Sequence, residues 1–489
     1  MHDAAPLFES LRRFVERGQA PFYSPGHKGG RTLDPWFREH IAAIDLNNLP
    51  DTDTLHCPEG PILEAERLIA DAWGVGLSFI LVQGSTSGNI AVALSALRPD
   101  EPVLVARNAH KSVLAGLVQV GARPVWLEPR WDARFGVAHG LDADDVERAF
   151  GESGAKALWV LHPTYYGTTG DIAALAELCR HHDAKLLVDG AHSPHFAFHP
   201  DLPTPGESAG AAATVQSVHK ILSGLSQAAV LHIDPAVLDP ASVRRGLQLI
   251  QTTSPHFAIM ASIDLARRQM MLHGRELLDQ TLARARDAAV RLAAIPGLQV
   301  LRPEHLAGAG TGLHQLDETK LLIGTAGLAA DARDIVERLN RVHGVQPELS
   351  GTGHVLCITT IGNTADDVER LIVGFEEVAT HVGRRSVDPE TGETGLIGDL
   401  LAVRPDTVLT PREAFFAADE AVPLSAAAGR IAAEAITPYP PGIPLVMPGE
   451  RLSTDVIDLL RALRNAGNPI SASDPTMGLV TVVLPTSAC

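Results

Sequence analysis

A chain of 489 residues, 45% of them hydrophobic, is too long for one compact core, so a large domain with smaller satellites is expected. Its 58 acidic against 40 basic residues give a net charge of -18, which offers no basic surface to nucleic acid or to anionic membranes. Cys57, Cys179, Cys357 and Cys489 form no CxxC pair, so neither a disulfide framework nor a zinc knuckle is predicted, and a reducing cytoplasm is the expected location.

The first predicted element lies within MHDAAPLFESLRRFVERG at the start of the chain. Its apolar residues Leu7, Leu11, Phe14 and Val15 have the spacing of one helix face. Because no long apolar stretch follows basic residues, the pattern predicts an amphipathic helix and neither an export signal nor a membrane span.

Between about residues 60 and 235, short β-rich runs alternate with helical patterns. The runs are SFILVQG, PVLVARN, RPVWLEP, AKALWVLHP, AKLLVDGAH and QAAVLHI, and segments such as LEAERLIADAWG and IAALAELCRHHDA separate them. Strands that alternate with helices predict a mostly parallel, doubly wound α/β sheet.

A long helical stretch then precedes a second pattern. DETKLLIGT, VQPELSG and HVLCITTIG have strand patterns, and DARDIVERLNRVHG and TADDVERLIVGFEEVA have helical ones, which predicts a small βαββα unit of α+β type. The polar GRRSVDPETGETG predicts a linker, and the proline-rich ITPYPPGIPLVMPGE a rigid extended connection. The predicted boundaries are 1–285 for an N-terminal segment with the large domain, 286–385 for the small domain and 386–489 for a C-terminal domain.

A Gly/Ser/Thr turn joins a strand to a helix in FILVQGSTSGNIAVALSAL. Backbone N–H groups and the hydroxyls of Ser85, Thr86 and Ser87 would meet there at a helix N-terminus, which is a phosphate cradle of the helix-dipole type. An ordinary helix N-cap explains the same pattern, and the spacing is not that of a Walker loop.

Two further residues of chemical interest end apolar strands. Asp189 follows AKLLV, where a carboxylate is costly unless it meets a cation such as a protonated pyridine nitrogen; a capping or metal-binding aspartate is the alternative. Lys220 follows TVQSVH, where burial can lower the pKa of a lysine and prepare it as a Schiff-base amine; a solvated surface lysine is the alternative. Cradle, Asp189 and Lys220 occur in the order expected for holding pyridoxal phosphate by its phosphate, ring nitrogen and aldehyde.

At these residues the sequence resembles the fold-type-I (aspartate-aminotransferase-like) pyridoxal-phosphate enzymes, and more narrowly the short bacterial form of the ornithine/lysine/arginine decarboxylase family. The resemblance covers nearly the whole chain. The motifs that carry it are FYSPGHKGG, DLNNLPDTDTLHCPEG, GSTSGN, RNAHKS, HPTYYG, VDGAHSPHF, QSVHK, QTTSPHF and PYPPGIPLVMPGE. GHKGG and YPPGIP distinguish this family from generic aminotransferases.

The resemblance implies a role for each cofactor residue. Lys220 would hold the cofactor covalently, Asp189 would pair with the pyridine nitrogen, His110 would stack over the ring and Ala191 would lie beneath it. Four side chains would hold the phosphate, namely those of Ser85, Thr86, Ser217 and His219. From their positions, His192 three residues after Asp189 and Thr164 in the loop HPTYYG, either side chain could also reach the phenolic oxygen of the cofactor.

The resemblance also implies a homodimer with shared sites. Thr252, Thr253 and Ser254 in QTTSPHF would approach the phosphate of a neighbouring subunit. The family often has an acidic residue directly after the aspartate of VDGAH, where this chain has Gly190, and this departure leaves the cofactor residues intact.

The reaction implied by the resemblance is decarboxylation of arginine, lysine or ornithine to the corresponding amine in polyamine metabolism, with an aminotransferase or a side-chain lyase as the alternative. A basic substrate needs an anionic contact, for which Glu450 and Asp474 are candidates, although each also fits a turn-capping carboxylate. Tyr165 and Tyr166 are either pocket residues or core aromatics.

No metal site is predicted. HSPHFAFHP offers His192, His195 and His199, but Pro194 and Pro200 break helical spacing and no HExxH motif is present. The glycines of GAGTG at 308–312 lack the strand-to-helix context of a dinucleotide loop, so a plain loop is expected there.

Overall fold

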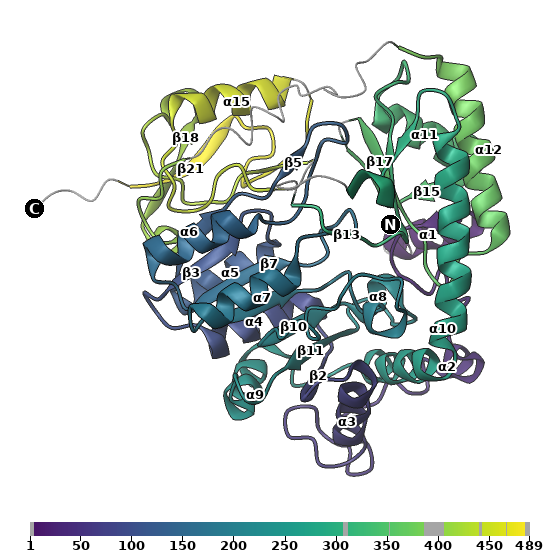
Figure 1. Cartoon of the computed structure of the whole chain (residues 1–489), viewed down its shortest axis with the longest axis horizontal. Helices are drawn as coiled ribbons and strands as arrows, with labels where there is room; N and C mark the ends of the chain where they lie inside the picture. The colour runs from purple at the N-terminus through teal and green to yellow at the C-terminus, as the bar shows by residue number, and fades with distance from the viewer. Residues whose placement is uncertain are drawn as a thin grey trace, which may run out of the picture.

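A seven-stranded sheet forms the centre of the computed structural model, which describes residues 4–306, 312–351, 353–385, 405–439, 443–465 and 467–484 (Figure 1). The strand order is β2-β11-β10-β9-β7-β3-β4. The strands are β2 (Leu77–Leu81), β3 (Pro102–Ala106), β4 (Arg123–Leu127), β7 (Ala157–Leu161), β9 (Lys185–Asp189), β10 (Ala213–Gln216) and β11 (Ala229–Ile233). Only β11 among them runs antiparallel to its neighbours, which confirms the predicted mostly parallel α/β sheet.

Helices cover both faces of this sheet, which explains why apolar side chains of its strands point to both faces. Val103 and Val105 of β3 pack into one core cluster with three helices, α4 (Gly84–Ala96), α5 (Lys111–Val120) and α9 (Pro240–Ile250). Leu104 and Ala106 face the opposite side, where α6 (Ala143–Ser153) and α7 (Ile172–His181) cover them. The alternation follows from the two-residue period of a strand.

A second sheet is built from four antiparallel strands in the order β12-β14-β17-β16. The elements of this layer are β12 (Gln299–Val300), β14 (Lys320–Gly324), α11 (Ala332–His343), β15 (Val345–Pro347), β16 (Leu349–Ser350), β17 (His354–Ile358) and α12 (Ala365–Val382). Its buried side chains pack against α11 and α12, as the βαββα pattern predicts; β12 is an additional strand.

The two layers are joined by α10 (Phe257–Ala293), a helix of 37 residues, so the predicted boundary at 285 lies inside a continuous helix. β1 (Ala20–Phe22) pairs in parallel with β15, which places the N-terminal segment against the small sheet although it is far away in sequence. α1 (Pro6–Glu16) forms where the amphipathic pattern predicts it. No described helix is long and apolar enough to cross a bilayer.

The C-terminal segment has a core of its own, centred on α15 (Thr454–Asn465) and the antiparallel pair of β18 (Asp419–Pro423) and β21 (Leu479–Val483). α14 (Pro411–Phe416) packs on α5 of the central layer. β19 (Thr437–Pro438) pairs with β20 (Ile470–Ser471). Residues 440–442 of the proline-rich motif, 386–395 of the predicted linker and 307–311 around GAGTG lie outside the described residues.

Candidate active site

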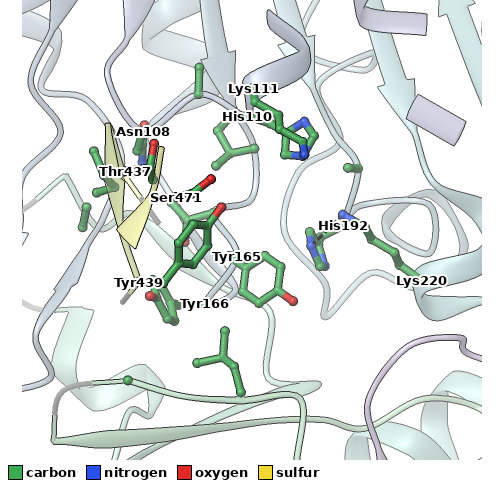
Figure 2. Close-up of a pocket in the computed structure, with 18 of the residues that line it drawn as sticks. Asn108, His110, Lys111, Tyr165, Tyr166, His192, Lys220, Thr437, Tyr439 and Ser471 are labelled. Atoms are coloured by element: carbon green, nitrogen blue, oxygen red, sulfur yellow. Dashed lines mark hydrogen bonds between the residues drawn. The ribbon is translucent and has the colours of Figure 1, made fainter. Parts of the chain in front are cut away.

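A cavity of about 1310 Å³ opens where the parallel strands of the central sheet end. Residues after β2, β3, β7, β9 and β10 form its floor, since the carboxyl ends of parallel strands meet at one edge of a sheet. Residues of the small sheet and of the C-terminal segment line the remaining walls. Figure 2 shows His192 and Lys220 on one side of the cavity and Thr437, Tyr439 and Ser471 on the other, with Tyr165 between them.

Asp189 is the last residue of β9 and its carboxylate is buried in the floor. Asn89 of α4 donates to its Oδ2 at 2.9 Å, and the backbone N–H of Ala191 donates to its Oδ1 at 3.1 Å. Both carboxylate oxygens therefore have a fixed orientation, as a residue that pairs with a protonated ring nitrogen requires.

Asn89 connects this carboxylate to His110. Its amide donates a second hydrogen bond to Ser112 Oγ at 2.9 Å, and Ser112 Oγ lies 2.8 Å from His110 Nδ1. Because Nδ1 also accepts from the Ser112 backbone N–H, the ring proton of neutral His110 lies on Nε2. The pKa of His110 is lowered, chiefly because the cavity wall removes water. Asn89 was not among the predicted residues, but it lies four residues after Ser85 on the same helix face.

Lys220 lies on the single turn α8 (Val218–Ile221) directly after β10, and its side chain lines the cavity. Burial lowers the pKa of its ammonium group, while Asp189 and Glu348 oppose that shift. Nζ lies 3.0 Å from His192 Nε2 and 6.0 Å from the centre of the Tyr165 ring. A lysine with a lowered pKa at the end of a cleft has the chemistry of a Schiff-base amine.

The phosphate cradle forms at the N-terminus of α4. Ser85 Oγ lies 2.7 Å from Ser217 Oγ, and Ser85, Thr86 and Ser217 all line the cavity. Ser87 does not: its hydroxyl donates to the Gly84 carbonyl at 2.9 Å, because its helix position turns the side chain away from the cavity. The prediction that Ser87 binds the cofactor is therefore corrected.

His219 and Thr164 line the cavity, and each side chain has a hydrogen-bond partner within the protein. His219 Nδ1 lies 2.9 Å from the Ala228 carbonyl and must donate to it, so Nε2 can donate to a phosphate only when the ring is protonated. Burial lowers the pKa of His219 to about 4, and a phosphate dianion beside it would oppose that shift. Thr164 Oγ1 lies 2.7 Å from Thr168 Oγ1.

The chain after Asp189 is too crowded for larger side chains. A Cβ on Gly190 would lie 2.6 Å from Ser193 Oγ and 3.0 Å from Thr214 Cγ2. The glycine that stands where the family often has an acidic residue therefore fits the tight packing around position 190. Ala191 lines the cavity, where its small side chain leaves space for a flat ring.

Neither predicted substrate carboxylate lines the cavity. Glu450 is buried, and its two oxygens bind the Arg107 guanidinium at 2.7 and 2.9 Å. Asp474 accepts hydrogen bonds from the backbone of Thr476, Gly478 and Leu479, which caps a turn. Both predictions are corrected, and the turn-capping alternative holds for Asp474. The carboxylates that do line the cavity are Asp189 and, from the small domain, Asp331 and Asp334.

The loop that carries Thr252, Thr253 and Ser254 lies beside the cavity and does not line it. The Thr252 N–H donates to Gln83 Oε1 at 2.9 Å, and Gln83 lines the cavity. Thr253 and Ser254 are exposed. Tyr165 and Tyr166, for which two interpretations were open, both line the cavity.

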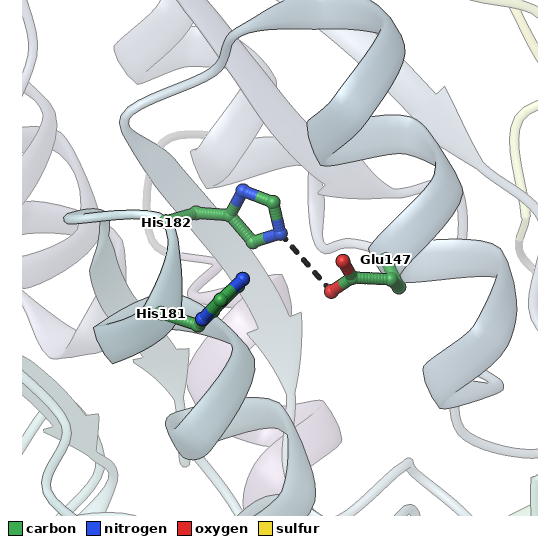
Figure 3. A group of neighbouring side chains, drawn as sticks. All are labelled: Glu147, His181 and His182. Carbon is green, nitrogen blue, oxygen red and sulfur yellow. Dashed lines mark hydrogen bonds and ion pairs between the residues drawn. The ribbon is translucent and has the colours of Figure 1, made fainter.

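The three histidines of HSPHFAFHP face different partners: His192 lies between Lys220 and Lys320, His195 beside Asp317, and His199 beside Asp279. Among the described residues, the one group with three potential metal ligands close together is Glu147, His181 and His182 on the outer helices α6 and α7 (Figure 3). None of these three side chains lines the cavity.

The residues present fit pyridoxal phosphate. Hydroxyls and helix N–H groups form an anion cradle, and the oriented carboxylate of Asp189 and the amine of Lys220 line the same cavity. Buried Asn89 Oδ1 has no hydrogen-bond partner among the described residues. The donor set matches the phosphate, ring and aldehyde of this cofactor.

Two family models match the chain: "Orn/Lys/Arg decarboxylase, major domain" over residues 5–367 and "Orn/Lys/Arg decarboxylase, C-terminal domain" over 396–470. An arginine decarboxylase of Bacillus subtilis is 34% identical over 98% of this chain and 97% of its own length. A lysine decarboxylase of Pseudomonas aeruginosa is 25% identical over 94% of this chain and 76% of its own.

Solved structures agree on the fold. Lysine decarboxylase A of Pseudomonas aeruginosa superposes with a TM-score of 0.79 at 23% identity, covering 94% of this chain and 78% of that chain. The ureidoglycine-glyoxylate aminotransferase of Bacillus subtilis superposes with a TM-score of 0.57 at 15% identity, covering 76% of this chain and 96% of that chain. The fold is therefore that of the fold-type-I pyridoxal-phosphate enzymes.

Proposed function

The chain belongs to the ornithine/lysine/arginine decarboxylase family and is a pyridoxal-phosphate-dependent decarboxylase of a basic amino acid, and we propose that this amino acid is arginine. The observation that carries the proposal is 34% identity to an arginine decarboxylase over 98% of the chain. The lysine decarboxylase is less similar, at 25%. The product would then be agmatine, which we propose enters polyamine metabolism.

When bound, pyridoxal phosphate supplies an electron sink for the pair left on the α-carbon as carbon dioxide departs. The chain's own residues would orient and hold it. Asp189, fixed by Asn89, would keep the ring nitrogen protonated, and the α4 cradle would hold the phosphate. Lys220 would supply the amine, and His110 would cover the ring from the end of β3.

The first measurement is decarboxylation of arginine, lysine and ornithine by the purified full chain, with the amine products identified by mass spectrometry. We expect agmatine to form with the highest kcat/KM. Cadaverine or putrescine as the main product would keep the family and overturn the proposed substrate. A protein that binds the cofactor and forms none of the three amines would instead direct attention to transamination or side-chain elimination.

Asp331 and Asp334, at the start of α11, are proposed to contact the cationic end of the substrate. Both side chains line the cavity, and Asp331 makes no capping hydrogen bond to its own helix. Arg333 lines the same wall and would repel a cation, so the two carboxylates together would provide the attraction.

Changing Asp331 or Asp334 to Asn is expected to raise the KM for arginine a few-fold each, since an exposed charge pair contributes about 0.2–1 kcal/mol. The double variant should raise it roughly tenfold. Arg333→Ala should lower KM, and Asp474→Asn, which removes a turn-capping charge outside the cavity, should leave it unchanged. Steady-state kinetics with arginine tests all five variants; an unchanged KM in the double variant would remove Asp331 and Asp334 from the substrate site.

We also propose a cytoplasmic homodimer in which Thr252, Thr253 and Ser254 approach the partner's cofactor phosphate. Two observations support it: Thr253 and Ser254 are exposed beside the cavity-lining Gln83, and the adjoining loop exposes Leu46 and Leu49. Light scattering of the full chain measures the mass that decides between monomer and dimer.

A further inference from the structure

His192 lies between two lysines that come from different layers of the fold. Its Nε2 is 3.0 Å from Lys220 Nζ, and its Nδ1 is 2.9 Å from Lys320 Nζ on β14 of the small sheet. His192 and Lys320 are 2% and 1% exposed, so the contact between them is closed to water. Figure 2 shows the His192 ring beside Lys220, with Tyr165 on the cavity side.

Hydrogen-bond chemistry restricts the protons in this row of three groups. A charged lysine only donates, and a neutral imidazole has one donor and one acceptor nitrogen. If both lysines were charged, both ring nitrogens would have to accept, which no imidazole can do. At least one lysine is therefore an uncharged amine, and the tautomer of His192 decides which one. Burial and the two lysines lower the pKa of His192 well below its usual value, so the ring is neutral.

The buried carboxylate of Asp317 stabilises the charged form of Lys320. Asp317 lies three residues before Lys320, fully buried; burial alone would raise its pKa, but His195 and Lys320 lower it, so the carboxylate is ionised. Burial lowers the pKa of Lys320 to about 8, with Asp317 and Glu348 opposing the shift.

Lys220 faces Asp189 and Glu348. The oxygens of Asp189 already accept from Asn89 and the Ala191 N–H, and Glu348 accepts from the Tyr165 hydroxyl and the Ser24 N–H. The other charged or titratable groups near the row are Lys28, His110, Tyr165, His195 and His219.

We propose that Lys320 is a positioning residue: it donates to Nδ1 of His192, places the ring proton on Nε2, and so holds Lys220 as an uncharged amine. An uncharged amine reacts with an aldehyde directly. Its lone pair forms the C–N bond, and the carbonyl oxygen leaves as water with both amine hydrogens. The inference rests on Lys220 as the amine that takes the cofactor, but it is tested without catalysis, so it can fail while the proposed decarboxylation stands.

The tautomer is measured directly by NMR of the cofactor-free full chain labelled with ¹⁵N-histidine, with His192→Gln used to assign the signals. The expected result is an acceptor-type shift at Nδ1 and a protonated-type shift at Nε2. The reverse assignment, with the proton on Nδ1, would overturn the proposal; the tautomer itself is read from the natural sequence, and His192→Gln serves only to assign the signals.

Two variants of Lys320 test the consequence. Lys320→Met should free the ring to accept from a charged Lys220, so the pH at which Lys220 reacts with an amine-acylating reagent should rise by about one unit or more. Lys320→Arg, which is always charged and only donates, should keep the natural profile. Lys28→Met is the matched control, because buried Lys28 bonds only to the Tyr23 and Ile358 carbonyls in this network and should leave the profile unchanged.

Labelling is followed by mass spectrometry of the Lys220 peptide over a pH series, with near-ultraviolet circular dichroism to confirm folding. An unchanged profile in Lys320→Met, or a shift of the same size in Lys28→Met, would contradict the proposal.

Discussion

Replacing Lys220 by Ala is expected to lower the decarboxylation rate roughly 10³-fold or more, because effects of this order follow removal of a covalent catalytic group. Lys111 is the other lysine that lines the cavity. Lys28, bound to backbone carbonyls, and Lys320, bound to His192, do not line it. Initial rates of carbon dioxide release at saturating cofactor measure the loss.

Borohydride reduction of the enzyme with its cofactor should attach the cofactor permanently to the peptide that contains Lys220. The chain has six lysines, Lys28, Lys111, Lys156, Lys185, Lys220 and Lys320, so peptide mapping separates them readily. Lys156→Ala is the matched control, since its exposed amine bonds to the His182 carbonyl outside the cavity, and it should keep full activity. A modified Lys111, which also lines the cavity, would show that Lys220 is not the amine that holds the cofactor.

Replacing Arg107 by Met is expected to destabilise the docking of the C-terminal segment by about 3–5 kcal/mol, because it leaves the charge of Glu450 buried without a partner. Arg107 is 6% and Glu450 1% exposed, and the guanidinium also donates to the Leu445 carbonyl. Glu450 in turn accepts from the Met447 N–H, so the pair fixes the chain that leads to the cavity wall at Ile443 and Pro444. Urea unfolding, monitored by far-ultraviolet circular dichroism, measures the change in unfolding free energy.

The double variant Arg107→Met with Glu450→Met should recover most of the loss, because a buried ion pair replaced by apolar side chains is often neutral in stability. Arg430→Met is the control within the same segment: Arg430 and Glu420 form a partly exposed pair, so the change should cost less than about 1 kcal/mol. Equal losses in Arg107→Met and Arg430→Met would mean that the buried pair has no special role in docking.

Local sequence patterns were sufficient to predict which residues lie at the ends of the central strands. Asp189 and Lys220 each follow an apolar run, and such runs form parallel strands whose carboxyl ends meet, so their proximity follows from the strand order. Asn89 could have been found in the same way from the helical spacing that places it beside Ser85. Ser87 was misassigned because a serine near a helix start bonds to the nearby backbone as readily as to a ligand.

Local sequence patterns could not predict which charged side chains from different layers of the fold pair with one another. Glu450 has the same local sequence signal as a turn-capping or substrate-binding carboxylate, yet it pairs with a residue 343 positions away. Lys320 and Glu348 belong to the small domain, and at these two residues the sequence predicts only strands. Lys320 contacts His192 and Glu348 contacts Tyr165 because the two sheets pack together.

The sequence by itself thus determined the α/β fold and the residues that follow each central strand, because apolar periodicity acts over short distances, and the resemblance carried by its motifs indicated the cofactor. Only the tertiary structure decided which buried charges neutralise one another and how protons are shared between Lys220, His192 and Lys320. Such pairings depend on a few ångströms of separation between segments more than 100 residues apart, and no local pattern encodes that separation.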